Sequence, residues 1–236
     1  MFTGLVQAVG EVVERAPVLE GVRLVVDPRG WDPGAGRGGS VAVNGCCLTL
    51  TGDPATDGGR LAFVAIPETL ERTGLRGLGV GSEVNLETAV SAATLMGGHF
   101  VQGHVDGTGR VVSVSRPGAD DAGEWRVRLE PSPSLMRFMA PKGSVCLDGV
   151  SLTIADLHAG DPTGAGGWIE VALIPETLEK TTLRDWAEGD AVNIEADILA
   201  KTVVHHLEHY TDRLGIERLG SGTAGVDAGG EPGGVL

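Results

Sequence analysis

The chain repeats itself, and this internal duplication restricts its fold more than any other feature. Four blocks recur in the same order, shifted by 99 to 108 positions: residues 4–6 return at 103–105, 40–50 at 144–154, 66–73 at 174–181, and 84–87 at 192–195. The second block reads SVAVNGCCLTL and then SVCLDGVSLTI, and the third reads IPETLERT and then IPETLEKT. Because repeated sequence indicates repeated structure, these matches predict two tandem copies of one unit of about 100 residues.

Length, charge and cysteine content exclude several classes of protein. A length of 236 residues permits one or two domains, and the repeat favours two. The net charge of −14 argues against nucleic acid or an anionic membrane as the main partner, because both attract clustered Lys and Arg. We find no apolar run long enough to span a bilayer and no signal peptide at the start. Three cysteines, two of them adjacent, argue against a disulfide framework and for a reducing cytoplasm.

Short Val-rich runs separated by Gly- and Pro-rich turns recur in both halves and predict β-strands. They lie at residues 5–13, 22–26, 40–50, 61–66 and 84–87, and again at 144–154, 168–174 and 192–195. Such spacing is typical of small antiparallel barrels, so we expect one barrel in residues 1–96 and another in 97–196. Pro67 and Pro175 are expected to open short helical turns, because proline fits the first helical position.

Residues 197–220 differ from the rest of the chain. The apolar residues Leu199, Val203, Leu207, Tyr210 and Leu214 are spaced 4, 4, 3 and 4 apart, which predicts an amphipathic helix. The helix has no counterpart within the first repeat, and it could either mediate oligomerisation or pack on its own barrel. The Gly-rich residues 221–236 are expected to be disordered.

Two motif matches are set aside because their context is wrong. Residues 34–39 fit the dinucleotide pattern G-x-G-x-x-G, but a turn-rich segment precedes them and a β-like run follows, where a strand and a helix are required. His205, Glu208 and His209 fit the zinc-protease pattern H-x-x-E-H, but no third protein ligand is evident. We interpret the first as a surface loop and the second as a solvated helix face.

Equivalent positions of the two repeats carry unequal polar groups. Cys47 corresponds to Ser151, Thr49 corresponds to Thr153, and His104 stands where the first repeat has Leu5. Cys47 could line a ligand site or be buried, whereas Cys46 and Cys146 do not align with each other and are expected to fill cores. Similar barrels with unequal linings suit a protein that holds two similar ligands, or two copies of one ligand in different roles.

The sequence resembles the riboflavin synthase family of the alpha-chain type over roughly residues 1–215. The resemblance rests on MFTGLV at 1–6, VNGCCLT at 43–49, GGHFVQGHVD at 97–106, DGVSLT at 148–153 and the paired IPETL blocks. It implies two six-stranded Greek-key antiparallel barrels and a C-terminal helix at 197–220 that assembles a homotrimer. The implied enzyme is a transferase that needs no metal or organic cofactor. It converts two molecules of 6,7-dimethyl-8-ribityllumazine into riboflavin and 5-amino-6-(D-ribitylamino)uracil, at a site between the N-barrel of one subunit and the C-barrel of its neighbour.

The resemblance also implies site residues. For the N-barrel pocket they are Gly4, Leu5, Val6, Cys47, Leu48, Thr49, Val64, Ala65, Ile66, Pro67, Glu68 and Thr69. For the C-barrel pocket or its interface they are Gly103, His104, Val105, Ser151, Leu152, Thr153, Ala172, Leu173, Ile174, Pro175, Glu176 and Thr177. Lys142 would reach the neighbouring subunit, and the catalytic candidates are Phe2, Cys47, His104, Ser151, Thr153 and Asp197, with their acid, base or nucleophile roles left open.

A non-catalytic alternative has the same fold. Lumazine proteins hold one chromophore as an optical antenna and tend to lose the pocket motif of the second barrel. Here the second copy is intact, with SLT at 151–153 and IPET at 174–177, which favours catalysis. One departure from the family is Thr88, where an Arg commonly follows the Val-Asn-Leu-Glu block. Whether lumazine synthase is a partner is left open by the resemblance.

Overall fold

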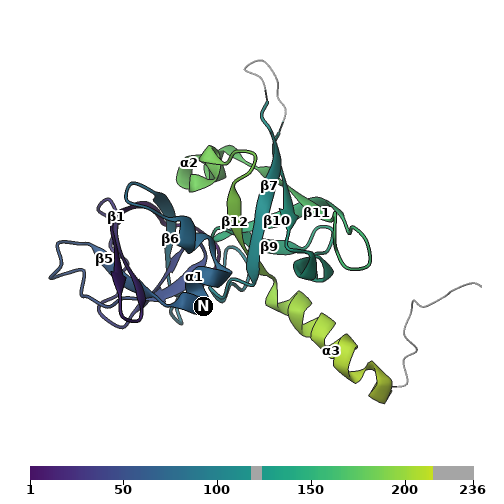
Figure 1. Ribbon diagram of the computed structural model, residues 1–236, viewed down its shortest axis with the longest axis horizontal. Helices are drawn as coiled ribbons and strands as arrows, with labels where there is room; N and C mark the ends of the chain where they lie inside the picture. Colours follow the sequence, from purple (N-terminus) through teal and green to yellow (C-terminus); the bar gives the residue numbers. More distant parts are fainter. Residues whose placement is uncertain (118–123, 215–236) are drawn as a thin grey trace, which may run out of the picture.

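The computed structural model describes residues 1–117 and 124–214, with side chains as far as residue 210, and contains two β-domains followed by a helix (Figure 1). The tail at 221–236 and the end of the helix expected at 215–220 lie outside the described residues. The first half forms a six-stranded antiparallel sheet in the order β4-β3-β6-β1-β2-β5. Its strands are β1 (Ala8–Val18), β2 (Gly21–Asp27), β3 (Ser40–Val43), β4 (Cys46–Thr49), β5 (Leu61–Ala65) and β6 (Glu83–Thr88).

The second half is a closed antiparallel barrel in the order β10-β11-β8-β7-β12-β9. Its strands are β7 (Gly107–Ser115), β8 (Trp125–Pro131), β9 (Ser144–Leu147), β10 (Val150–His158), β11 (Trp168–Leu173) and β12 (Ala191–Ala196). When each strand is matched to its repeat, both halves have the same cyclic order, and the order 1-2-5-4-3-6 is that of a Greek key. The predicted duplicated β-architecture is therefore confirmed.

The two halves differ at one seam. β10 runs on for nine residues and pairs with β11 from Ile154 to His158, which closes the second barrel. β4 ends at Thr49, because the next residues enter a loop with Gly52 and Pro54, and β4 and β5 form no ladder. A single backbone bond, from the N–H of Thr51 to the carbonyl of Ala62 at 2.9 Å, spans this seam. The first half is thus a six-stranded sheet with barrel order and one open edge, and we call it the first barrel.

Short helices follow β5 and β11, as the paired prolines predict. α1 (Pro67–Arg72) leads into the 3₁₀ turn η1 (Gly74–Gly77), and α2 (Pro175–Lys180) leads into η3 (Thr182–Asp185). A third 3₁₀ turn, η2 (Pro133–Phe138), lies in the second barrel. Each barrel has its own core, made almost entirely of aliphatic side chains because the chain has few aromatic residues.

Reciprocal hydrogen bonds join the barrels. The side-chain amide of Asn85 donates to the Asp148 carbonyl at 2.8 Å, and that of Asn193 donates to the Asn44 carbonyl at 2.8 Å. Both asparagines belong to the repeated Val-Asn-x-Glu block, and Asn44 and Asp148 are equivalent. Both asparagines are almost fully buried, so this pseudo-two-fold contact satisfies polar groups that burial would otherwise leave unpaired.

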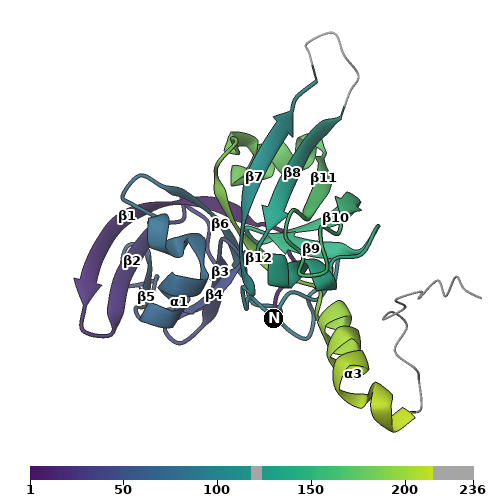
Figure 2. The same ribbon diagram turned by 45° about the vertical axis from the view of Figure 1, so that its right-hand side comes forward.

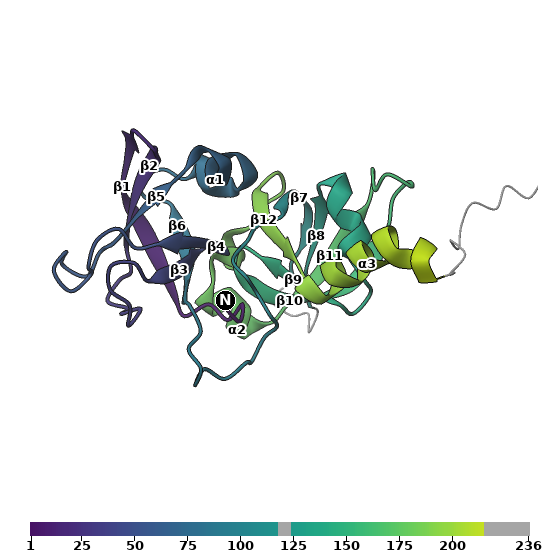
Figure 3. The same cartoon turned by 90° about the horizontal axis from the view of Figure 1, so that it is seen from below.

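The C-terminal helix α3 (Ile198–Leu214) projects away from both barrels (Figures 1, 2 and 3). Its predicted apolar stripe is not covered: Leu199, Val203 and Leu207 are 62%, 57% and 49% exposed. The stripe therefore does not pack on its own barrel. His205 and His209 also lie on exposed turns of α3, and within the described ranges no three His, Cys, Asp or Glu side chains gather to hold a metal ion. None of the helices described is long and apolar enough to cross a membrane.

Candidate functional site

Two short segments cross between the barrels and pair with each other. We call residues 2–6 the first strap and residues 101–105 the second strap. Phe2 and Val101 form an antiparallel bridge, with the N–H of Phe2 donating to the Val101 carbonyl at 2.7 Å and the reverse bond at 3.2 Å. Both side chains are buried, Phe2 completely. The catalytic candidate Phe2 is thus a packing residue of this crossing in the single chain.

The first strap lies on the second barrel. The carbonyl of Gly4 accepts the N–H of Ser151 at 2.7 Å, and Val6 packs against the second barrel's core. A Cβ added to Gly4 would lie 2.6 Å from the Ser151 Cβ, and Gly4 has φ +74°, so only glycine allows this approach. The expectation that residues 4–6 line the pocket of the first barrel is wrong.

The second strap lies on the first barrel in the equivalent way. The carbonyl of Gly103 accepts the N–H of Cys47 at 2.8 Å, and Val105 packs against the first barrel's core. A Cβ on Gly103, whose φ is +78°, would lie 2.6 Å from the Cys47 Cβ. Of the two predicted placements of residues 103–105, a pocket of the second barrel is thus excluded in the single chain, because this segment lies on the first barrel. The physical reason is the bridge between the straps, which carries each one past its own barrel onto the other.

A cavity of about 400 Å³ lies on the first barrel between β4, α1 and the second strap. Six of the sequence-predicted residues line it: Cys47, Glu68, Thr69, Gly103, His104 and Val105. Others predicted for this barrel have different environments, since Leu48 and Ala65 are buried and Thr49, Ile66 and Pro67 are exposed. The cavity thus brings together the Cys47 thiol and the His104 imidazole, two of the catalytic candidates, whereas Ser151 and Thr153 do not line it.

The cysteines divide as the sequence suggested. Cys46 and Cys146 are buried, and burial raises the pKa of Cys46 to about 12 and that of Cys146 well above its ordinary value. Both therefore remain neutral thiols that fill space, as predicted. Cys47 is half-buried and lines the cavity, which favours the ligand-lining alternative.

The equivalent surface of the second barrel carries a serine–histidine pair. The Ser151 Oγ lies 2.7 Å from the His99 Nδ1, beneath the first strap. Burial lowers the pKa of His99, although the charge of Asp197 acts in the opposite direction, so the imidazole is neutral at neutral pH. A neutral imidazole hydrogen-bonded to a hydroxyl can accept its proton, which is the arrangement of a general base.

His99 was missed as a site residue, although it stands inside the GGHFVQGHVD motif. Its partner is 52 positions away, and no repeat counterpart signals it. The His99 Nε2 is buried and has no hydrogen-bond partner among the described residues.

The remaining predicted residues of the second barrel are dispersed. Leu173 is buried, whereas Thr153, Ile174, Pro175 and Glu176 are exposed. Leu152, Ala172 and Thr177 are partly buried. A second cavity, of about 720 Å³, is lined by residues from both halves of the chain. Val6 is the only predicted site residue that lines it.

Two other catalytic or binding candidates have visible structural roles. Asp197 caps α3, because its carboxylate accepts the N–H of Leu199 at 2.9 Å. Lys142 lies in the exposed turn before β9 and donates to the Ala155 carbonyl at 3.3 Å. Neither lines the 400 Å³ cavity within the single chain.

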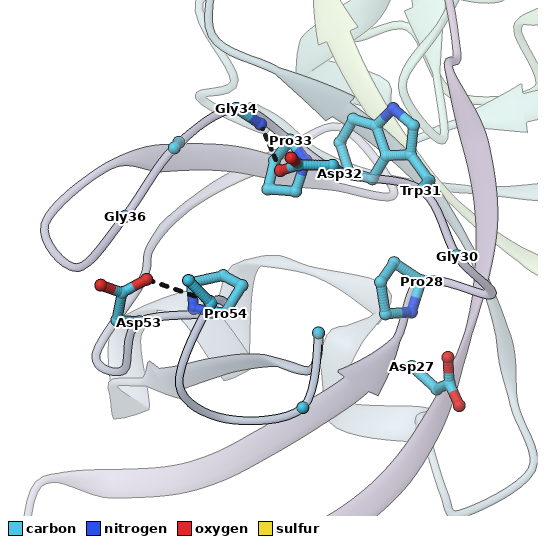
Figure 4. Close-up of a pocket in the computed structure, with 14 residues that line it drawn as sticks. Asp27, Pro28, Gly30, Trp31, Asp32, Pro33, Gly34, Gly36, Asp53 and Pro54 are labelled. Atoms are coloured by element: carbon cyan, nitrogen blue, oxygen red, sulfur yellow. Dashed lines mark hydrogen bonds between the residues drawn. The ribbon is translucent and has the colours of Figure 1, made fainter.

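A different cavity, of about 630 Å³, lies between the loops at 27–36 and 53–59 (Figure 4). It includes Trp31 and part of the G-x-G-x-x-G match, but none of the predicted site residues. The carboxylates of Asp32 and Asp53 accept the N–H groups of Gly34 and Ala55 at 2.8 and 3.1 Å, so they stabilise their own turns. No helix follows the glycines, because Ser40 opens β3, which confirms that this is a loop and not a dinucleotide site.

Comparison with known proteins gives consistent matches over most of the chain. The lumazine binding domain family matches twice, at residues 3–89 and 102–197. Riboflavin synthase of Mycobacterium tuberculosis (strain ATCC 25618 / H37Rv) is 43% identical over 204 residues, which cover 86% of this chain and 96% of that protein. Riboflavin synthase of Schizosaccharomyces pombe is 36% identical over 217 residues, covering 91% and 93%.

Solved structures show the same fold. The crystal structure of LumP complexed with 6,7-dimethyl-8-(1'-D-ribityl) lumazine superposes with a TM-score of 0.68 and covers 83% of this chain and 99% of that one. Its sequence identity is 23%, so this likeness concerns the fold alone.

Proposed function

The chain belongs to the riboflavin synthase family of tandem lumazine-binding proteins, and on that premise we propose that it is a riboflavin synthase. Two molecules of 6,7-dimethyl-8-ribityllumazine react, and one transfers a four-carbon unit to the other. The products are riboflavin and 5-amino-6-(D-ribitylamino)uracil. The observation that carries the proposal is the presence of two equivalent strap-covered sites in one chain, with Cys47 in one and Ser151 in the other.

The chemistry suits these residue types. The 7-methyl group of a lumazine is a carbon acid, because the anion formed by its deprotonation is delocalised through the heterocycle. A base such as the neutral His99, acting through the Ser151 hydroxyl, can assist that proton loss. The second lumazine must be held against the first in the correct orientation, and such positioning supplies a large part of the rate enhancement of two-substrate reactions.

The arrangement of subunits is part of the same proposal. The exposed stripe at Leu199, Val203 and Leu207 supports assembly of a homotrimer through α3, because isolated surface helices seldom leave such a stripe uncovered. The reaction site then forms between the first barrel of one subunit and the second barrel of its neighbour. The barrels correspond to residues 1–96 and 97–196, and the protein works in the cytoplasm.

The decisive experiment is to incubate the purified full chain with 6,7-dimethyl-8-ribityllumazine alone and follow riboflavin fluorescence. We expect riboflavin to accumulate with one diaminouracil product per riboflavin, at a rate proportional to protein and absent without it. A stable lumazine emission with no riboflavin would overturn the proposal and would favour an antenna protein. Retention of full activity by a monomeric variant would overturn the inter-subunit site.

A further inference from the structure

Two buried glutamates occupy equivalent positions at the ends of the repeated Val-Asn-x-Glu blocks. Glu87 is 3% exposed and Glu195 is 2% exposed. Neither lines the 400 Å³ cavity or contacts the serine–histidine pair. A buried carboxylate is costly unless hydrogen bonds compensate it, so its partners indicate what it does.

Glu195 is bonded to the backbone of the second strap. Its Oε1 accepts the N–H of Gln102 at 2.6 Å, and its Oε2 accepts the N–H of Gly103 at 2.9 Å. The carbonyl of Gly103 in turn accepts the N–H of Cys47. A continuous path of hydrogen bonds therefore leads from β12 of the second barrel, through the strap, to the cavity of the first barrel.

Glu87 makes the equivalent contacts with the first strap. It accepts the N–H of Thr3 at 2.6 Å, the Thr3 hydroxyl at 2.7 Å and the N–H of Gly4 at 3.0 Å. The carbonyl of Gly4 then accepts the N–H of Ser151. The two halves thus use the same device, and each carboxylate acts on the site of the opposite barrel.

The second strap has an additional anchor that the first lacks. The ammonium of Lys201, on α3, contacts both carboxylate oxygens of Asp106 at 3.0 and 2.9 Å, and Asp106 also accepts the N–H of Ala196 at 2.8 Å. In the first repeat the neutral Gln7 takes the place of Asp106 and accepts the N–H of Thr88 at 3.0 Å. The strap beside Cys47 is therefore held at two points by charged groups.

We propose that Glu195 is a positioning residue for the site on the first barrel: it fixes Gly103 and His104 over Cys47, and thereby sets the shape of the cavity. Glu87 has the same role for Gly4 over Ser151. The effect on catalysis rests on the proposed function, whereas the effect on the strap does not. A glutamine at position 195 cannot replace the carboxylate, because its amide nitrogen would face one of two backbone N–H donors.

The test is the variant Glu195→Gln, with the exposed Glu188→Gln as the matched control. Cys47 is the accessible cysteine, since Cys46 and Cys146 are buried, so labelling by a thiol reagent measures how well the strap covers it. Loss of one hydrogen bond to a charged acceptor should raise the labelling rate about tenfold. The control should label like the parent chain, and thermal unfolding should show that both variants are folded.

Steady-state kinetics separate positioning from folding. We expect kcat of Glu195→Gln to fall by up to about 10²-fold, the cost of a small misplacement of a reacting group, in protein that is still folded and still binds lumazine. Faster labelling in a chain without synthase activity would support the strap role and reject the proposed function. Unchanged labelling in folded Glu195→Gln would overturn the inference, whatever the activity. If that variant does not fold, Asp106→Asn loosens the same strap and must also speed the labelling of Cys47.

Discussion

Replacing Asp148 by asparagine should remove a pH dependence from the stability of the second barrel. Asp148 lies in the turn between β9 and β10 and is 7% exposed. Its Oδ1 accepts the N–H of Asn193 at 2.8 Å, and its Oδ2 accepts the indole N–H of Trp186 at 3.2 Å. Burial outweighs these bonds and raises the pKa of the carboxyl from 3.8 to about 7.

Whether stability rises or falls with pH depends on which state, folded or unfolded, binds the proton of Asp148 more tightly. Because the pKa of Asp148 is higher in the folded chain than in the unfolded chain, the folded state is favoured when the carboxyl is protonated. This contribution is fully present below pH 3.8 and is lost as the pH rises to about 7. At about 1.4 kcal/mol per pKa unit, the shift corresponds to a loss of about 4 kcal/mol across that window.

The first repeat shows which replacement the turn accepts. Asn44 occupies the equivalent position, and its Oδ1 accepts the N–H of Asn85 at 2.7 Å. Asp148 has φ +44°, a left-handed conformation that asparagine also tolerates. Asp148→Asn should therefore keep one hydrogen bond and lose the other, since its amide nitrogen would face the Trp186 indole. That loss costs about 1–3 kcal/mol at every pH.

Urea unfolding between pH 5 and pH 8, followed by Trp fluorescence, separates the two effects. The parent chain should lose about 3 kcal/mol of stability relative to Asp148→Asn between pH 5 and pH 7, because this range covers two units of the titration. The double variant Asp148→Asn/Trp186→Leu copies the first repeat, where Asn44 and Leu78 are the equivalents of Asp148 and Trp186, and should recover part of the constant loss. Parallel curves for the parent chain and Asp148→Asn would refute the reasoning.

Three further outcomes follow from the site. Gly103→Ala, which would push a Cβ to 2.6 Å from that of Cys47 at a positive φ, should lower activity by about 10²-fold in steady-state assays, whereas Gly77→Ala, with nothing within 4 Å, should not. His99→Gln should lower kcat by about 10² to 10⁴-fold and remove the acid limb of the pH–rate profile; an unchanged profile would exclude a proton-transfer role. Leu207→Glu should give folded monomers by light scattering, and a persisting trimer would contradict assembly through α3.

The repeat made the short helices and the strands in blocks 40–50 and 84–87 predictable, because each of these blocks had a second copy to confirm it. Strands β7 and β8 were not predicted, since no repeated block covers them. Pro67 and Pro175 begin α1 and α2 as expected. The seam between β4 and β5 was not predictable, since strand ends depend on whether the next strand offers free hydrogen-bonding groups. The N–H groups of Ala55, Thr56 and Gly59 donate within the loop itself, whereas β10 continues and pairs with β11.

The position of each strap on the opposite barrel could not be predicted from the sequence either. Gly4 and Gly103 were recognised as equivalent, but equivalence does not say which barrel a segment preceding a strand will lie on. That choice depends on the Phe2–Val101 bridge and on the two glutamates, which act between residues 84 and 93 positions apart. Their block looked like the end of a strand, and a glutamate there is expected to be exposed.

The barrels meet as two identical subunits meet across a two-fold axis. In such an interface, residue i contacts residue j and j contacts i. Asn85 reaches the turn at Asp148 while Asn193 reaches the equivalent turn at Asn44, and each strap covers the site of the other barrel. Duplication therefore kept the contacts between the barrels equal, whereas divergence changed the linings, the seam between β4 and β5, and the anchor at Asp106. The strap over each site and the carboxylate that holds it both come from the opposite half of the chain. Neither site is therefore complete without both halves, and a change in the last strand of one barrel alters the site on the other barrel.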